Sequence, residues 1–286
     1  MLRLNTILCP VDFSDATPHQ VKLAADIARL SGGRLVLHHN LASLALGAGV
    51  GWMWAADQRP PLSSEEAAAR LDSLAATLAD GVPVEFRITE GPASKAVVTI
   101  SNAIDADLIV LSTHHASSEE HTSVTSTVLD RAHRAVLALH DTDVDTHVLV
   151  LDAAAGTRQV AVVPTDLTPE SATAVAFAFE LARTLPLQLH LVHFIRPGTT
   201  PHHSSVYDAM RALIPDEFQD TTRVTVTGDD PVHGIARAAA EAGASCIVMG
   251  EHTRSPLARW FSHDTSDGVL HEAPCPVWYI PRRRAA

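Results

Sequence analysis

The chain has 286 residues, a formal net charge of -12 at pH 7 and a pI near 5.7. Nucleic-acid phosphates and anionic membrane surfaces repel a chain this acidic, so neither is expected as a partner. No apolar run reaches the ~20 residues of a membrane-spanning helix, and the N-terminal segment lacks the order of a signal peptide. We therefore expect a cytoplasmic protein.

The first half of the chain alternates strand-like and helix-like segments. Short apolar runs rich in β-branched residues predict strands buried on both faces, and apolar positions at helical spacing predict helices between them. Ser14 is expected to cap the first helix, and Gly32-Gly33 to end it. In chain order we expect strands at 4–11, 34–40, 84–89, 107–112 and 136–140, with helices ending near 33 and spanning 63–79, 93–104 and 126–134.

The second half follows the same plan. Thr168-Pro169 is a helix start, because a capping hydroxyl is followed by proline in the first turn. Strands are expected at 159–164, 188–194, 223–227, 245–250 and 277–280, with helices between them. Strands that alternate with helices imply right-handed crossovers and a parallel sheet covered on both faces.

The two halves are copies of one unit in the same register. The segment ending at Val11-Asp12 recurs before Asp166, and 108–114 corresponds to 246–252. Further matches are Asp26 with Glu180, Arg29 with Arg183, Leu35 with Leu189, Leu37 with Leu191, and His39 with His193. We predict an α/β fold of two tandem doubly wound domains, residues 1–144 and 145–286, each a five-stranded parallel sheet flanked by helices.

The strand ends are where a ligand is expected. In open doubly wound sheets, ligands bind beyond the carboxyl ends of the strands, which gives one candidate site per repeat. Asp12 and Asp166 each stand between a strand and a helix, so helix capping and polar contact with a nucleotide are both open. The first site would hold Asp12, Asn40, Ser112 and His114, and the second Asp166, Phe194, Gly250 and His252.

Four segments together indicate a family. They are Pro10-Val11-Asp12-Phe13-Ser14, Gly228 with Pro231, Val248-Met249-Gly250-Glu251-His252, and above all Leu270-His271-Glu272-Ala273-Pro274-Cys275-Pro276-Val277. In combination, and over nearly the whole chain, the sequence resembles the universal stress protein family in its tandem form. The resemblance implies five-stranded parallel sheets that commonly pair through their last strands.

The resemblance also implies a ligand, because many members bind ATP. Their aspartate after the first strand lies near the adenosine, and a glycine signature, G-x-x-G, nine residues, then G-S or G-T, surrounds the phosphates. Bare glycine backbone lets N–H groups approach the phosphates closely. Carried onto this chain, the expected nucleotide-binding residues are Asp12, Asn40, Ser112, His115, Thr125, Ser126, Asp166 and Gly250.

That glycine signature is altered in the second repeat. Gly250 is kept, but Thr253 stands where the next glycine is expected. The later G-S pair falls at His263-Asp264, where the aspartate would repel a phosphate. Gly250 is then better explained by a tight turn at the strand end than by phosphate binding.

The first repeat departs differently. Ser112 and His115 replace the glycines, and the later pair is Thr125-Ser126 or Ser126-Thr127. Hydroxyls can donate to a phosphate, although side chains here occupy the place of bare backbone. The first repeat is therefore slightly favoured as the anion site. The chain has no G-x-x-x-x-G-K-[ST], G-x-S-x-G or H-E-x-x-H motif.

The 17 histidines raise the question of a metal. Imidazole suits zinc and nickel, and convergence at the strand ends would bring several rings together. No local i, i+4 spacing with an acidic partner supports this, so histidines that fill polar gaps are the expected alternative. The metal candidates are His39, His114, His193, His252 and His263. Trp52 and Trp54 form either a lid, a partner-binding patch or a loop packed by its own aromatics.

We predict from this a tandem universal stress protein that acts as a non-catalytic stress-response or ligand-sensing module. ATP or another adenine nucleotide is the first ligand to test. The alternatives are a ligand-free protein-interaction scaffold and, third, a metal-binding protein or weak ATPase. The repeats are expected to form an internal pseudo-dimer through the last strands at 136–140 and 277–280, which could also join two chains in a homodimer.

Overall fold

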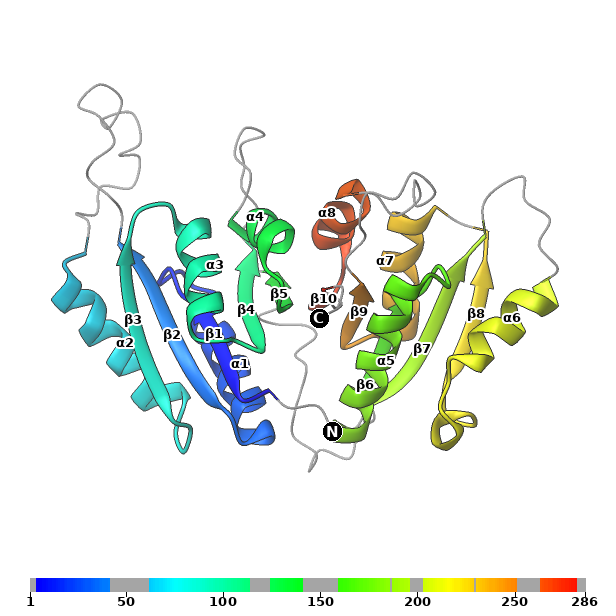
Figure 1. The fold of residues 1–286 in the computed structure, drawn as a ribbon, viewed down its shortest axis with the longest axis horizontal. Helices are drawn as coiled ribbons and strands as arrows, with labels where there is room; N and C mark the ends of the chain where they lie inside the picture. The colour runs from blue at the N-terminus through cyan, green and yellow to red at the C-terminus, as the bar shows by residue number, and fades with distance from the viewer. Residues whose placement is uncertain are drawn as a thin grey trace, which may run out of the picture. The chain divides into compact units, whose positions relative to one another are not determined.

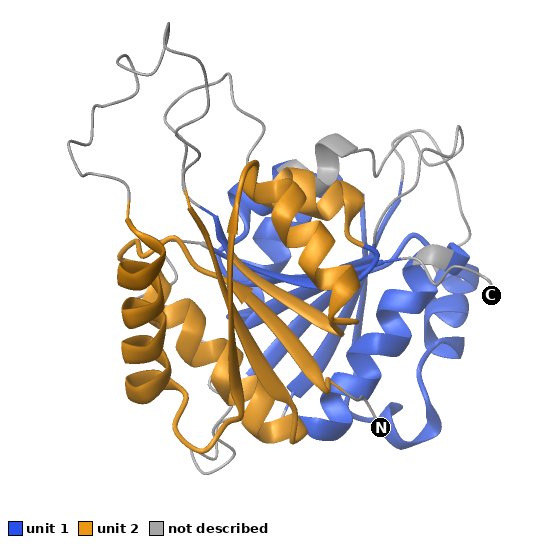
Figure 2. Cartoon of the chain, turned by 60° about the vertical axis from the view of Figure 1, so that its left-hand side comes forward, with its two compact units in different colours: residues 1–3, 112–115, 133–286 blue, residues 4–111, 116–132 orange. Residues whose placement is uncertain are grey.

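The computed structural model describes residues 4–41, 62–113, 124–140, 159–185, 187–195, 203–228, 230–250 and 263–281. The chain divides into two compact units (Figure 2). Unit 2 comprises residues 4–111 and 116–132, and unit 1 comprises residues 1–3, 112–115 and 133–286. The units differ from the sequence repeats, because the last strand of the first repeat lies in unit 1. The domain boundary expected at 144/145 lies outside the described residues and stays a prediction.

Unit 2 is built on parallel strands in the order β3-β2-β1-β4. In Figure 1, α1 lies behind these strands and α3 in front of them, and α3 packs against α4. In chain order the elements are β1 (Thr6–Pro10), α1 (Thr17–Ser31), β2 (Arg34–Leu41), α2 (Ser64–Leu78), β3 (Val84–Glu90), α3 (Ala93–Ala103), β4 (Leu108–Thr113) and α4 (Val124–Arg131). β4 ends just inside unit 1. These elements confirm the order expected from the sequence.

Unit 1 contains the second repeat, whose parallel strands follow the order β8-β7-β6-β9-β10. The elements of unit 1 are β5 (Ala135–His140), β6 (Gln159–Pro164), α5 (Pro169–Thr184), β7 (Leu187–Phe194), α6 (His203–Ala212), a 3-10 turn (Asp216–Phe218), β8 (Arg223–Thr227), α7 (Pro231–Ala242), β9 (Cys246–Gly250), α8 (His263–Glu272) and β10 (Val277–Ile280). This order mirrors that of unit 2, which confirms the tandem doubly wound fold.

The last strands of the two repeats pair with each other. β5 runs antiparallel to β10, with Leu137 opposite Trp278 and Ala138 opposite Val277. Both strands are buried, and Phe177 of α5 packs on Trp278 with ring centroids 5.7 Å apart. The pseudo-dimer pairing expected from the sequence is thus present inside one chain.

Helix starts follow the sequence in part. Thr168 caps α5 by accepting from the backbone N–H of Ser171, and Ser63 caps α2 in a capping box with Glu66. The expected cap of α1 by Ser14 is wrong. The helix begins after Ala16 without a side-chain cap, and the Ser14 hydroxyl forms no hydrogen bond within the described residues.

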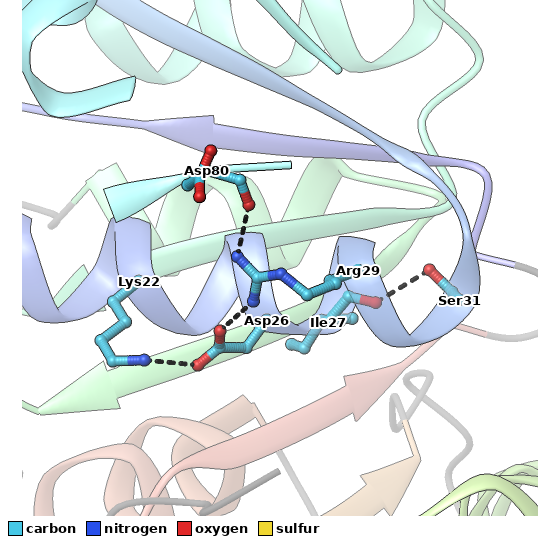
Figure 3. Close-up of polar contacts among 6 residues, drawn as sticks. All are labelled: Lys22, Asp26, Ile27, Arg29, Ser31 and Asp80. Atoms are coloured by element: carbon cyan, nitrogen blue, oxygen red, sulfur yellow. Dashed lines mark hydrogen bonds and ion pairs between the residues drawn. The ribbon is translucent and has the colours of Figure 1, made fainter. Parts of the chain in front are cut away.

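In each repeat, an arginine at the same position of the first helix binds a residue in a more distant turn. Arg29 pairs with Asp26, which also accepts from Lys22 Nζ at 2.9 Å, and donates to the carbonyl of Asp80 at 3.0 Å (Figure 3). Arg183 likewise pairs with Glu180 and reaches Glu217. Exposed ion pairs contribute about 0–1 kcal/mol each, so these contacts mainly fix position. The residues that match between the repeats thus form equivalent ion pairs, Arg29 with Asp26 in one and Arg183 with Glu180 in the other.

Among the described residues, no helix combines the length and the apolar character that crossing a bilayer requires.

Gly33 provides a test of close packing at the end of α1. A Cβ at this position would lie 2.2 Å from the backbone oxygen of Leu4, which has no freedom to move away. We expect Gly33→Ala to lower the free energy of unfolding by about 2 kcal/mol, measured by urea denaturation. Gly228→Ala is the matched control, since a Cβ there meets nothing within 4 Å and should change little. Equal midpoints for the two variants would contradict this packing.

Candidate functional site

A turn built around an aspartate follows the first strand of each repeat. In unit 2, Asp12 Oδ1 accepts from the backbone N–H of Ser14 at 2.9 Å and from Thr17 Oγ1 at 3.1 Å. Phe13, between them, has a φ of 61°. This left-handed conformation is rare for a bulky residue and costs about 1 kcal/mol or more, so the surrounding contacts must hold it.

The second repeat contains the same turn. Asp166 Oδ1 accepts from the Thr168 backbone N–H at 3.0 Å and from its hydroxyl at 2.6 Å, and Leu167 has a φ of 64°. The capping interpretation of the two aspartates is therefore correct in one respect, because each organises the turn before a helix. Asp12 is exposed, whereas Asp166 is half-buried.

The turn of unit 2 stands at the topological switch point of its sheet. β1 pairs with β2 on one side and β4 on the other, and the pairing with β4 extends only to Leu8 and Ile109. Beyond that pair, the buried Gln20 side chain donates to the carbonyls of Pro10 at 2.6 Å and Val110 at 2.8 Å. The amide of Gln20 thus bridges the two strands where they stop pairing. Sequence reasoning missed this residue, because a glutamine within a helix carries no motif.

His39 braces the Asp12 turn from β2. Its Nδ1 lies 2.8 Å from the carbonyl oxygen of Val11, and a carbonyl only accepts, so Nδ1 carries the hydrogen. The ring also packs against Phe13, tilted by 39° with centroids 4.5 Å apart, and Arg70 of α2 lies 5.4 Å from the centroid of Phe13. His193 makes the equivalent contact to the Thr165 carbonyl at 2.8 Å. These two metal candidates therefore have a structural role, since each uses Nδ1 to hold a strand end.

Asn40 belongs to a polar network that joins β2 to the loop before α3. Its Nδ2 donates to the Gly91 carbonyl at 2.7 Å, and its Oδ1 accepts from Thr89 Oγ1 at 2.9 Å. Thr89 uses its one hydrogen in that bond, so it accepts from His38 Nε2, 2.8 Å away. Burial lowers the pKa of His38 to about 4, with the neighbouring His39 adding to the effect. His38, which contacts the site through Thr89, is therefore neutral at pH 7.

Other predicted residues lie at the expected element ends. Ser112 is half-buried at the end of β4, and Gly250 is buried at the end of β9. Thr125 and Ser126 belong to the first described turn of α4. His114, His115, His252, Trp52 and Trp54 lie outside the described residues, as does the side chain of His263.

Metal ligands do not cluster in the part of the chain that the structure describes. There, no group of three or more histidine, cysteine, aspartate and glutamate side chains is placed to hold an ion. Cys9, Cys246 and Cys275 are buried, and burial raises the pKa of Cys9 and of Cys246, the latter to about 12. These thiols fill space in the core, as expected from the sequence.

One family model matches the chain twice. The model of the universal stress protein family covers residues 4–140 and 157–281. The chain belongs to the universal stress protein family. Its two matches confirm the tandem form of this universal stress protein. A comparison with curated proteins gives no match.

Solved structures share the fold of this tandem universal stress protein over nearly its full length. A universal stress protein from Archaeoglobus fulgidus DSM 4304 has 18% sequence identity and a TM-score of 0.73, covering 98% of this chain and 97% of that chain. A functionally unknown protein from Pseudomonas aeruginosa PAO1 has 16% identity and a TM-score of 0.63, covering 97% and 92%. These likenesses establish the fold alone.

Two buried histidines give this universal stress protein a predictable response to acid. The pKa values of His38 and His190 are both lowered from 6.5 to about 4, mainly by burial. The unfolded chain therefore takes up protons first, and stability present above pH 6.5 is lost as the pH falls towards 4. We expect the double variant His38→Gln/His190→Gln to flatten this loss, by up to about 1.4 kcal/mol per pH unit for each histidine.

Urea denaturation at several pH values between 7 and 4 measures this slope. The exposed His133→Gln, which follows α4, controls for the removal of a histidine as such. A double variant with the wild-type slope would show that these two rings do not titrate as buried groups.

Proposed function

We propose that this tandem universal stress protein is a non-catalytic module that binds an adenine nucleotide beyond the carboxyl end of β1 in the first repeat. Binding would bias the protein towards one conformation and so change its choice of partner. The observation that carries the proposal is the turn at Asp12, where Ser14 and Thr17 hold an exposed carboxylate at the switch point and the next residue, Phe13, is left-handed.

The chemistry of this turn suits a nucleoside. A carboxylate accepts hydrogen bonds from ribose hydroxyls or from an exocyclic amine, and the Asp12 carboxylate is fixed by Ser14 and Thr17 before any ligand arrives. Preorganisation of this kind lowers the entropic cost of binding. Asn40, held by Thr89 and Gly91, adds an oriented amide on the neighbouring strand.

The phosphates would extend towards the first turn of α4. Thr125 and Ser126 lie there, and hydroxyl and backbone N–H groups at a helix start suit an anion.

Asp12→Asn tests the proposal most directly. The asparagine keeps the size of the side chain but removes the charge, and hydrogen bonds to a charged group contribute about 1.5–3 kcal/mol. We expect the affinity for ATP, measured by isothermal titration calorimetry with Mg²⁺, to fall at least about tenfold. Asp15→Asn, at an exposed position in the same turn, serves as the matched control.

Nucleotide retained by the purified protein gives an independent measurement. Denaturation should release adenine absorbance from the wild type and less from Asp12→Asn. A wild type that neither releases nucleotide nor binds millimolar ATP would instead favour the ligand-free scaffold.

A further inference from the structure

The second repeat carries a phenyl ring where the first carries an amide. Phe194 and Asn40 occupy equivalent places, because each follows the histidine that holds the strand end and each lies beside an equivalent threonine, Thr227 or Thr89. Asn40 is half-buried and bonded to Gly91, whereas Phe194 is 5% exposed. The two repeats therefore present different surfaces at the same strand end.

The ring of Phe194 packs against Gly234, a position of α7 that has no side chain. A Cβ built on Gly234 of α7 would lie 2.3 Å from Cε1 of Phe194 and within 3.2 Å of two other ring atoms. The equivalent residue of α3 is Ala96, since Gly234 donates to the N-cap residue Asp230 as Ala96 donates to Pro92. Phenylalanine and glycine in the second repeat thus replace asparagine and alanine in the first.

Residues of the aspartate turn in the second repeat also form hydrogen bonds with one another. The hydroxyls of Thr165 and Ser171 lie 3.0 Å apart, and Thr165 Oγ1 accepts from the backbone N–H of Leu167 at 3.1 Å. Thr168 directs both its N–H and its hydroxyl at Asp166. Val11 stands at the place of Thr165 in the first repeat and offers no hydroxyl, so the Asp12 turn lacks this inner network.

We propose that Phe194 and Gly234 close the second repeat to ligand, so that the protein binds one nucleotide per chain, in the first repeat. The ring lies against the first turn of α7 at Gly234, whereas the shorter amide of Asn40 in the first repeat is held by the carbonyl of Gly91. The identity of the ligand rests on the proposed function, whereas the position of the ring does not. The pair acts as a determinant of stoichiometry.

A double-mutant cycle tests the position of the ring without any ligand. Gly234→Ala should lower the Tm of the wild type, because the new methyl group meets the ring of Phe194. In the Phe194→Asn background the same change should raise the Tm by about 2 °C, because alanine favours a helix over glycine. The same sign in both backgrounds would overturn the proposal. Phe194→Leu replaces the asparagine variant if the latter does not fold.

Exchange of the pair between repeats tests the closure itself. Asn40→Phe with Ala96→Gly copies the second repeat into the first and should weaken ATP binding at least tenfold, measured by calorimetry. Ala103→Gly, an exposed position at the end of the same helix, controls for helix weakening. The reverse exchange, Phe194→Asn with Gly234→Ala, should raise the stoichiometry from one towards two.

The outcomes separate the two proposals. A wild type that binds two nucleotides, or an Asn40→Phe/Ala96→Gly variant that binds like the wild type, would overturn the closure and leave the nucleotide proposal standing. A wild type that binds none would overturn the nucleotide proposal, and the Tm cycle would still decide whether the ring of Phe194 packs against Gly234.

Discussion

Burial of the parallel strands on both faces is the constraint on which the rest of the structure depends. Leu8 and Ile109, at the last pairing of β1 with β4, have no exposed surface. Strands enclosed in this way have no room for charged groups, so polar chemistry is confined to their ends. Gln20 is a polar side chain that does enter the core, and its amide nitrogen donates to two strand carbonyls, those of Pro10 and Val110.

Duplication has preserved backbone geometry more strictly than side chains. The residue after the aspartate is left-handed in both repeats, although one is Phe13 and the other Leu167. Such a conformation is costly for either residue, so its presence twice means that the turn, rather than the side chain, is what the fold requires. His39 and His193 support that turn through the same bond to a backbone carbonyl, which depends only on the strand path.

The sequence was sufficient to predict features that depend on local periodicity. The alternation of strands and helices, the cap at Thr168 and the register of the repeats all follow from residue spacing, and the structure contains them. The prediction for Ser14 failed because the helix begins after Ala16, and the backbone N–H of Thr17 donates to the carbonyl oxygen of Ser14 instead of its hydroxyl.

Features that depend on contacts between distant segments could not be predicted. Gln20 contacts a carbonyl 90 positions away, and the fit of Phe194 to Gly234 joins a strand to a helix of a later crossover. The role of His39 was missed for a related reason, because a histidine at a strand end looks the same in sequence whether it holds a carbonyl or a metal.

The antiparallel pairing of β5 with β10 has a consequence for folding. Leu137 lies opposite Trp278, which follows it by 141 positions in the chain. Closing a loop of this length costs chain entropy before any contact is gained, so this pairing is expected to form after the local strand and helix contacts of each repeat. Until β10 is in place, the edge of β5 that it covers is open to pairing with another chain.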